Sequence, residues 1–133
     1  MEQVVAALDV GGTSIKSGVV RGDTRAEPIV ELGPALPTLG QSDAETILAR
    51  LAEMADHALA LDDHPIGLAI AICGPFDLEA GESRMRGVAK FEDIYGVDLR
   101  AALRARTTIG DRPIRFTRDA ESAATGEALT GAG

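Results

Sequence analysis

Short apolar runs bounded by glycine, proline or charged residues recur along the chain, and this pattern is typical of β-strands. They occupy residues 4–8, 15–20, 28–32, 66–73 and 113–117. The run 66–73 is the most hydrophobic and has proline on both sides, which predicts a central strand buried on both faces. The first three runs are separated only by turn-like segments. They therefore predict an antiparallel meander, followed by a loop from Gly33 to Gln41.

Helical spacing of apolar residues replaces this pattern between the third and fourth runs. One face carries Ile47, Leu51, Ala55, Ala58 and Leu59. We predict a helix over 43–61 that begins at a capping box, in which Ser42 caps the helix and Glu45 reaches back. Two further helices are predicted, one over 99–106 after the N-cap residue Asp98 and one over 120–129.

The order of these elements defines a fold class. A meander, a helix and a buried strand imply a crossover through the helix, so the strand 66–73 should run parallel to the first strand. We therefore predict an α/β fold with a mixed five-stranded sheet, made of the antiparallel meander and parallel strands with helices on the faces. Ligands in such sheets bind beyond the carboxyl ends of the strands. Residues 9–11 and 74–75 are both expected at that edge.

The turn after the first strand carries candidate chemistry. Asp9 ends the strand, Gly11 and Gly12 follow, and Thr13 precedes the next strand. Adjacent glycines permit positive φ and a close approach of a bulky group, and the bare amides of such a turn can bind an anion. A carboxylate at its edge can hold a hydrated divalent cation. The turn is thus either a phosphate clamp with a metal anchor beside it or an ordinary Gly-Gly hairpin.

Composition narrows the class of partner. The chain has 133 residues and a net charge of −8, which argues against nucleic acid or an anionic membrane surface as the main partner. No apolar run approaches the length of a membrane span. Cys73 is the only cysteine, so no intrachain disulfide can form, and a reducing cytoplasm is the expected location.

Two later stretches each allow a structural and a functional interpretation. Arg84, Arg86 and Lys90 lie close together in an irregular segment of an acidic chain, which is either a solvated surface loop or a loop that faces substrate. Asp119 stands between a predicted strand and a predicted helix. It is there either as a helix N-cap or as a functional carboxylate.

Three motifs follow one another in the chain. The first is residues 8–13 with Lys16, the second is residues 71–77 with Gly81, and the third is residues 119–127 followed by Gly131-Ala132-Gly133. Together they resemble the N-terminal lobe of the ROK family of sugar kinases and repressors, within the ribonuclease H-like superfamily of actin-like ATPases and hexokinases. The resemblance covers nearly the whole chain, from about Val4 to the last residue.

This resemblance implies ATP-dependent phosphorylation of a sugar hydroxyl, as in glucokinase-like hexose kinases, with ATP and Mg²⁺ as cofactors. Gly11, Gly12 and Thr13 would contact the ATP phosphates together with Lys16. Asp9 would position Mg²⁺ through water. Phosphoryl transfer requires phosphate donors, a metal and a carboxylate that orients the nucleophile, so these residue types agree with the implied activity.

The resemblance also assigns the sugar side of the site. Asp119 would be the catalytic base that takes a proton from the attacking sugar hydroxyl, and Gly74 and Pro75 would line the sugar pocket with Lys90 and Arg118. Arg118 stands where these kinases commonly have asparagine, and Lys90 lies in the loop 87–91, which often supplies another asparagine in this family. Since Lys and Arg only donate hydrogen bonds, whereas Asn also accepts them, the sugar is left open, with an acidic or phosphorylated sugar as one candidate.

The chain is shorter than members of this family, which have about two such lobes. We therefore expect residues 1–133 to be the N-terminal lobe of a larger enzyme, nearly inactive without its C-terminal lobe. A lobe without its partner exposes the face that the partner covers. This predicts an apolar patch near residues 126–133 and self-association into a homo-oligomer.

Two other functions are compatible with the same residues. One is a non-catalytic sugar-binding or interaction module that keeps the fold without the chemistry. The other is an actin-like or chaperone-like ATPase lobe.

Overall fold

The computed structural model describes residues 3–22, 29–87 and 91–118. Its strands are β1 (Gln3–Val10), β2 (Ser14–Gly22), β3 (Ile29–Pro37), β4 (Leu68–Ile72), β5 (Phe76–Asp77), β6 (Glu82–Ser83) and β7 (Ile114–Thr117). The helices are α1 (Ala44–Leu59), the 3₁₀-helix η1 (Glu92–Ile94) and α2 (Leu99–Arg106). Within these ranges no helix is long and apolar enough to cross a membrane.

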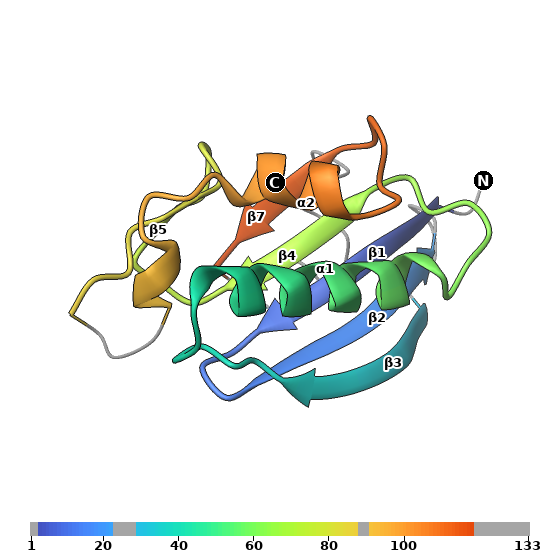
Figure 1. Ribbon diagram of the computed structural model, residues 1–133. Helices are drawn as coiled ribbons and strands as arrows, with labels where there is room; N and C mark the ends of the chain where they lie inside the picture. Colours follow the sequence, from blue (N-terminus) through green and yellow to red (C-terminus); the bar gives the residue numbers. More distant parts are fainter. Residues whose placement is uncertain (1–2, 23–28, 88–90, 119–133) are drawn as a thin grey trace.

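A mixed five-stranded sheet in the order β3-β2-β1-β4-β7 forms the centre of the molecule, with β5 and β6 as a separate ribbon (Figure 1). β1, β2 and β3 pair antiparallel, whereas β1, β4 and β7 pair parallel. The predicted α/β fold, the meander and the crossover through the first helix are therefore confirmed. The predicted helix over 120–129 and the expected apolar patch at 126–133 lie outside the described residues.

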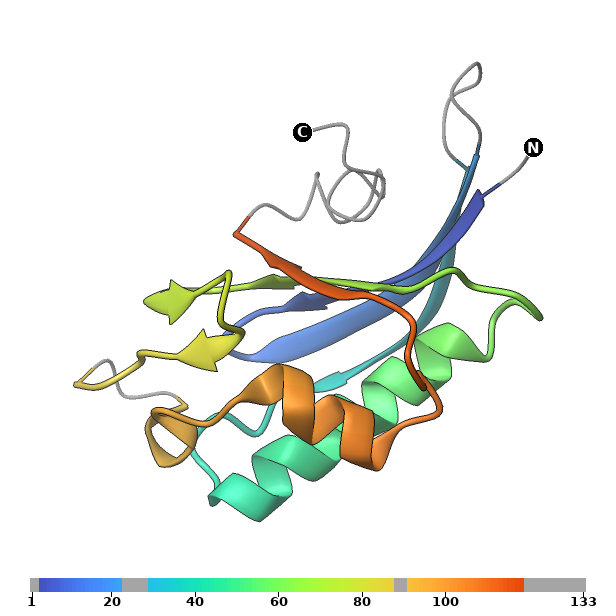
Figure 2. The same cartoon turned by 90° about the horizontal axis from the view of Figure 1, so that it is seen from above.

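Helices α1 and α2 lie on one face of the sheet (Figure 2). Because side chains alternate along a strand, Leu8 and Val10 of β1 face these helices and belong to the main core. The neighbours that alternate with them, such as Val5, join Ala69 and Ala71 in a second buried cluster. All of β4 is buried, as predicted for the central strand.

The third strand is longer than its sequence pattern predicts. Residues 33–37 were expected to form a loop, yet β3 continues through them to Pro37. A register shift at Lys16–Gly18 of β2 accommodates the pairing, and β3 is the last strand of the sheet on this side, where proline is tolerated. A Cβ on Gly33 would lie 2.8 Å from Ser17 Oγ, so glycine lets the two strands approach here.

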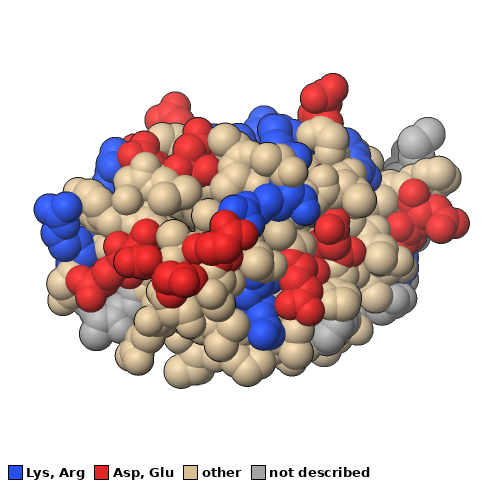
Figure 3. All heavy atoms as spheres, in the orientation of Figure 1, with Lys and Arg blue, Asp and Glu red and all other residues tan. Residues whose placement is uncertain are grey.

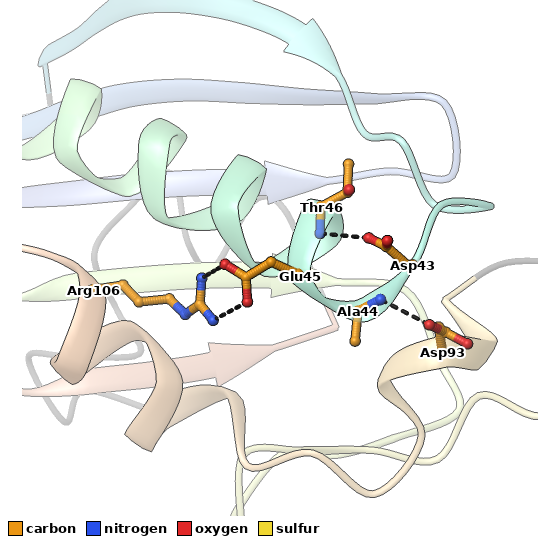
Figure 4. Close-up of polar contacts among 6 residues, drawn as sticks. All are labelled: Asp43, Ala44, Glu45, Thr46, Asp93 and Arg106. Atoms are coloured by element: carbon orange, nitrogen blue, oxygen red, sulfur yellow. Dashed lines mark hydrogen bonds and ion pairs between the residues drawn. The ribbon is translucent and has the colours of Figure 1, made fainter.

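Helix α1 begins one residue later than predicted, and its cap is Asp43 rather than Ser42 (Figure 4). The Asp43 carboxylate accepts a hydrogen bond of 2.8 Å from the Thr46 amide, and Asp93 of η1 accepts one of 2.8 Å from the Ala44 amide. Two of the unpaired amides of the first turn are thereby satisfied. The predicted cap of α2 by Asp98 is confirmed, since its carboxylate accepts from the Ala101 amide.

Glu45 does not reach back to its own helix but pairs with Arg106 at the end of α2. The guanidinium donates two hydrogen bonds, of 2.8 and 2.7 Å, to the two carboxylate oxygens (Figure 4). A bidentate ion pair of this kind is stronger than a hydrogen bond to a backbone amide. Glu45 therefore pairs with Arg106 instead of accepting the amide hydrogen bond of the predicted capping box. Asp56 of α1 holds the loop after α2 in place, because its carboxylate accepts hydrogen bonds from the amide and the hydroxyl of Thr108, both at 3.0 Å.

Acidic and basic side chains are interspersed with uncharged ones on the face that carries these pairs (Figure 3). The hydrogen bonds from Arg106, followed by its charge, hold the pKa of Glu45 below its ordinary value, and the same contact raises the pKa of Arg106. A depressed carboxylate pKa means that the folded state favours the ionised form. Its contribution to stability is present above the ordinary glutamate pKa of about 4.3 and is lost as the pH falls through the lower, folded value.

We expect Glu45→Gln to lower the free energy of unfolding at neutral pH, and this difference from the original chain should shrink as the pH falls below about 4. Urea denaturation across this pH range measures it. Asp63→Asn is the matched control, because Asp63 is an exposed acid without an ion pair in the described part of the chain. An equal, pH-independent loss in both variants would contradict the role of the Glu45–Arg106 pair.

Candidate functional site

The carboxyl ends of the three parallel strands meet at one edge of the sheet (Figure 1). Asp9 of β1 is in register with Ala71 of β4, and Ala71 is in register with Thr117 of β7. The segments that follow these strands therefore lie together at this edge of the sheet. They are the loop 11–13, the Gly74–Pro75 segment and Arg118.

The glycine loop joins β1 to β2 with Gly12 and Thr13 exposed. Neither Gly11 nor Gly12 has a positive φ, so the left-handed conformation that adjacent glycines permit is not used here. A Cβ at position 11 would lie 3.1 Å from the Ser14 carbonyl oxygen, so a larger residue there would crowd the turn. The amides of Gly12 and Thr13 donate to no other group in the described part of the chain, which leaves them available to an anion.

Thr38 holds this loop in place, and the sequence pattern did not single it out. Its side chain is fully buried, its hydroxyl donates a 2.8 Å hydrogen bond to the Gly11 carbonyl, and its amide donates one of 3.0 Å to the Thr13 carbonyl. Both ends of the loop are thus fixed by Thr38, the residue directly after β3. Neither periodicity nor a motif marks a threonine in this position, so only the three-dimensional pairing reveals it.

Asp9 is half-buried at the end of β1 and points to the face opposite Leu8 and Val10. Lys16 is its backbone partner across the β1–β2 pair and is exposed, yet the two side chains form no ion pair within the described residues. The carboxylate is therefore free to bind a cation. No group of three metal-ligating side chains exists in residues 3–22, 29–87 and 91–118, so a metal here needs water or phosphate oxygens as its other ligands.

The Gly74–Pro75 segment and Arg118 lie against one another. The Gly74–Pro75 bond is cis, and a Cβ on Gly74 would lie 2.7 Å from Arg118 Nη1. Arg118 Nη2 donates a 3.2 Å hydrogen bond to the Phe76 carbonyl. The structure thus brings Gly74, Pro75 and Arg118 together, and part of the guanidinium is engaged with the loop after β4.

The other predicted substrate residues, Lys90 and Asp119, lie outside the described residues. Asp119 is two residues beyond Thr117, the last residue of β7. The two arginines grouped with Lys90 are engaged locally: Arg84 pairs with Glu82 at 2.8 Å, and Arg86 stacks on Tyr95, 4.1 Å from the ring centroid. This favours a structural role for them.

Gly87 and Phe91, the described residues on either side of the range 88–90, each donate a backbone hydrogen bond. The Gly87 amide donates a 2.6 Å hydrogen bond to the Glu92 carboxylate, and the Phe91 amide donates one of 2.7 Å to the Gly40 carbonyl. Phe91 is fully buried despite a left-handed backbone with φ of 56°. The Phe91 contact lies close to the start of α1, since Gly40 precedes that helix by four residues.

A comparison with known protein families identifies the family of this chain. The chain matches the ROK family model over residues 5–133 and therefore belongs to the ROK family. No curated protein sequence was matched.

Several solved structures that this chain resembles are described as sugar kinases. A glucokinase from Parabacteroides distasonis is 28% identical, with a TM-score of 0.65 over 96% of this chain and 34% of that chain. A ROK family glucokinase from Streptomyces griseus, solved with glucose and AMPPNP, is 21% identical, with a TM-score of 0.63 over 96% of this chain and 36% of that chain.

A hexokinase from Schistosoma mansoni complexed with glucose is 18% identical, with a TM-score of 0.66 over 91% of this chain and 31% of that chain. At this identity the likeness shows the fold alone. The chain spans about a third of the length of all three proteins.

The contacts of Thr38 yield a prediction about the loop. We expect Thr38→Val to lower the free energy of unfolding by about 1 kcal/mol, because the Gly11 carbonyl loses its side-chain donor. Urea denaturation measures the change. Ser42→Ala is the control, since its hydroxyl makes no hydrogen bond in the described part of the chain. An unchanged stability of Thr38→Val would show that the hydroxyl does not hold the loop.

Proposed function

We propose that this chain is the N-terminal lobe of a glucokinase-like enzyme that transfers the γ-phosphoryl group of ATP to a sugar hydroxyl. The observation that carries the proposal is the register of Asp9, Ala71 and Thr117, with the exposed glycine loop at the same sheet edge. Membership of the ROK family and the glucokinase with 28% identity support it. The C-terminal lobe would supply the rest of the site, since domains of this size pair across a cleft.

In this proposal the glycine loop binds the ATP phosphates. The free amides of Gly12 and Thr13 donate to phosphate oxygens, and Lys16 on the adjacent strand adds a positive charge. Asp9 holds Mg²⁺ through water. The chemistry of the residues fits, because a single unpaired carboxylate beside phosphate-binding amides suits a metal that keeps most of its water ligands. When bound, Mg²⁺ neutralises charge on the phosphates.

Asp119 acts on the sugar in this proposal. It orients the attacking hydroxyl and accepts its proton, and its task is chiefly alignment. Gly74, Pro75 and Arg118 form one wall of the sugar pocket with Lys90 beside them. The loop after β4 supplies backbone carbonyls and amides for sugar hydroxyls, and the cationic residues favour a sugar with an acidic or phosphorylated substituent.

We also propose the binding partners and the cellular location of the enzyme. Its partners are a sugar, a nucleotide and the C-terminal lobe of the same protein, and its location is the cytoplasm. Without the C-terminal lobe, copies of residues 1–133 associate through the face that this lobe would cover.

The role of Asp119 is tested in a form of the protein that contains both lobes. Asp119→Asn should lower kcat by about 10²–10⁴-fold without loss of folding, because the hydroxyl loses its base. A coupled assay of ADP release with a panel of sugars and MgATP measures it. Asp111→Asn, the change of an exposed acid seven residues before Arg118, is the matched control. Normal turnover of Asp119→Asn would remove the assignment.

A second candidate function is a non-catalytic sugar-binding module of the same fold. Arg118 favours it, because its guanidinium bonds to the Phe76 carbonyl at a position where the resemblance implies an asparagine for a sugar hydroxyl. Calorimetry of the two-lobed protein with neutral and acidic sugars separates the two functions. Sugar binding without any turnover of MgATP supports the module, whereas turnover supports the kinase.

A further inference from the structure

A pocket lies beyond the outer edge of β7, between the β5–β6 ribbon and α2. It is lined by Leu78, Glu79, Arg100, Arg115 and Phe116 and has a volume of about 550 Å³, within the range of small-molecule sites. Strand β4 lies between β7 and β1, the strand that leads into the glycine loop, and the pocket is on the side of β7 away from β4. The pocket is therefore distinct from the proposed ATP site.

Two guanidinium groups converge in this pocket. Arg100 Nε and Arg115 Nη1 donate to the same acceptor, the Ile114 carbonyl oxygen, at 3.0 and 3.3 Å. The two positive charges therefore lie side by side. Each guanidinium has five N–H donors, and only two of Arg100 and one of Arg115 are used in the described structure.

Neither guanidinium is neutralised. Within the described part of the chain neither Arg100 nor Arg115 forms an ion pair, although Arg84 and Arg106 each pair with a glutamate. Glu79 lines the pocket, but its link to Arg100 is the backbone carbonyl, which accepts from Nη1 at 3.0 Å. Like charges at short distance repel, so an anion between them is the natural complement.

The pocket is built rather than incidental. The two bonds of Arg100 to carbonyls fix its guanidinium, whose carbon lies 5.3 Å from the centroid of the Phe116 ring. Gly81 has φ of +74°, and a Cβ there would lie 3.0 Å from Phe116 and 3.2 Å from Arg100 Nη1. Glycine thus lets the β5–β6 ribbon close over these side chains.

We propose that this pocket binds a small phosphate monoester. The phosphate lies between the guanidinium groups of Arg100 and Arg115, which match a tetrahedral anion with several acceptor oxygens. The organic part contacts Leu78 and Phe116, and its hydroxyl groups donate to the Glu79 carboxylate. This site is independent of the proposed phosphoryl transfer.

The test is a titration of the full chain with glycerol 3-phosphate and with inorganic phosphate at constant ionic strength, followed by the backbone amide resonances of Leu78, Glu79 and Phe116. Saturable shifts with glycerol 3-phosphate bound more tightly than phosphate are expected. Arg115→Gln should weaken binding about tenfold, through loss of charged hydrogen bonds. This variant keeps the fold, since Arg115 is exposed and makes only the 3.3 Å bond.

Control variants separate a local site from general charge. Arg50→Gln removes the same charge from α1, where Arg50 pairs with Glu53, and should leave the affinity unchanged. Glu79→Gln should tighten the binding of inorganic phosphate by removing a repulsive charge, whereas Glu53→Gln should not. Absence of saturable shifts, equal affinity for the two phosphates, or equal effects of Arg50→Gln and Arg115→Gln would each overturn the proposal.

Discussion

The parallel register of β1, β4 and β7 is the constraint on which the rest of the structure depends. A slip of one residue would turn every side chain of a strand to the opposite face. Asp9 would then point into the core under α1, and Leu8 would leave it. The packing of Leu8, Val10, Ile70 and Ile72 on the helices therefore also sets the direction of the candidate metal ligand. Core and site are two consequences of one alignment.

Arginines that bond to carbonyl oxygens hold the segment between α2 and β7. Arg112 donates to the carbonyls of Thr108, Ile109 and Pro65, and Arg104 donates to those of Gly110 and Arg112. Backbone carbonyls without a strand or helix partner are thereby satisfied. Because a carbonyl carries no net charge, these hydrogen bonds leave the positive charge of each arginine in place.

The sequence predicts most elements because burial follows a simple periodicity. The apolar run of β4 and the helical spacing of apolar residues in α1 predict these two elements directly, and Asp98 caps α2 as its position implies. Predictions fail where distant pairing overrides a local signal. Gly33 and Pro34 mark a loop by composition, yet pairing with β2 keeps the strand extended. Glu45 completes a capping box by spacing, yet Arg106 attracts it.

The candidate site, like the fold, has one part that the sequence predicts and another that it does not. The strand order predicts residues 9–11 and 74–75 at one edge of the sheet, and the register of β1 with β4 agrees with this placement, with Arg118 beside them. Their roles in binding stay predictions. Thr38 and the convergence of Arg100 and Arg115 have no sequence signature, because each arises from contacts between segments far apart in the chain. The roles of Asp119 and Lys90 stay predictions.

The two outermost strands of the described sheet, β3 and β7, both carry features that hinder the addition of another strand. On β3, Pro34 and Pro37 have no amide hydrogen to offer a neighbour, although Leu32 is 77% exposed. On β7, the Ile114 carbonyl is already occupied by two guanidinium groups. A strand added at β3 would meet the prolines, and one added at β7 would have to displace the guanidinium groups from the Ile114 carbonyl. The described sheet is therefore a poor template for the edge-to-edge growth of an amyloid-like fibre.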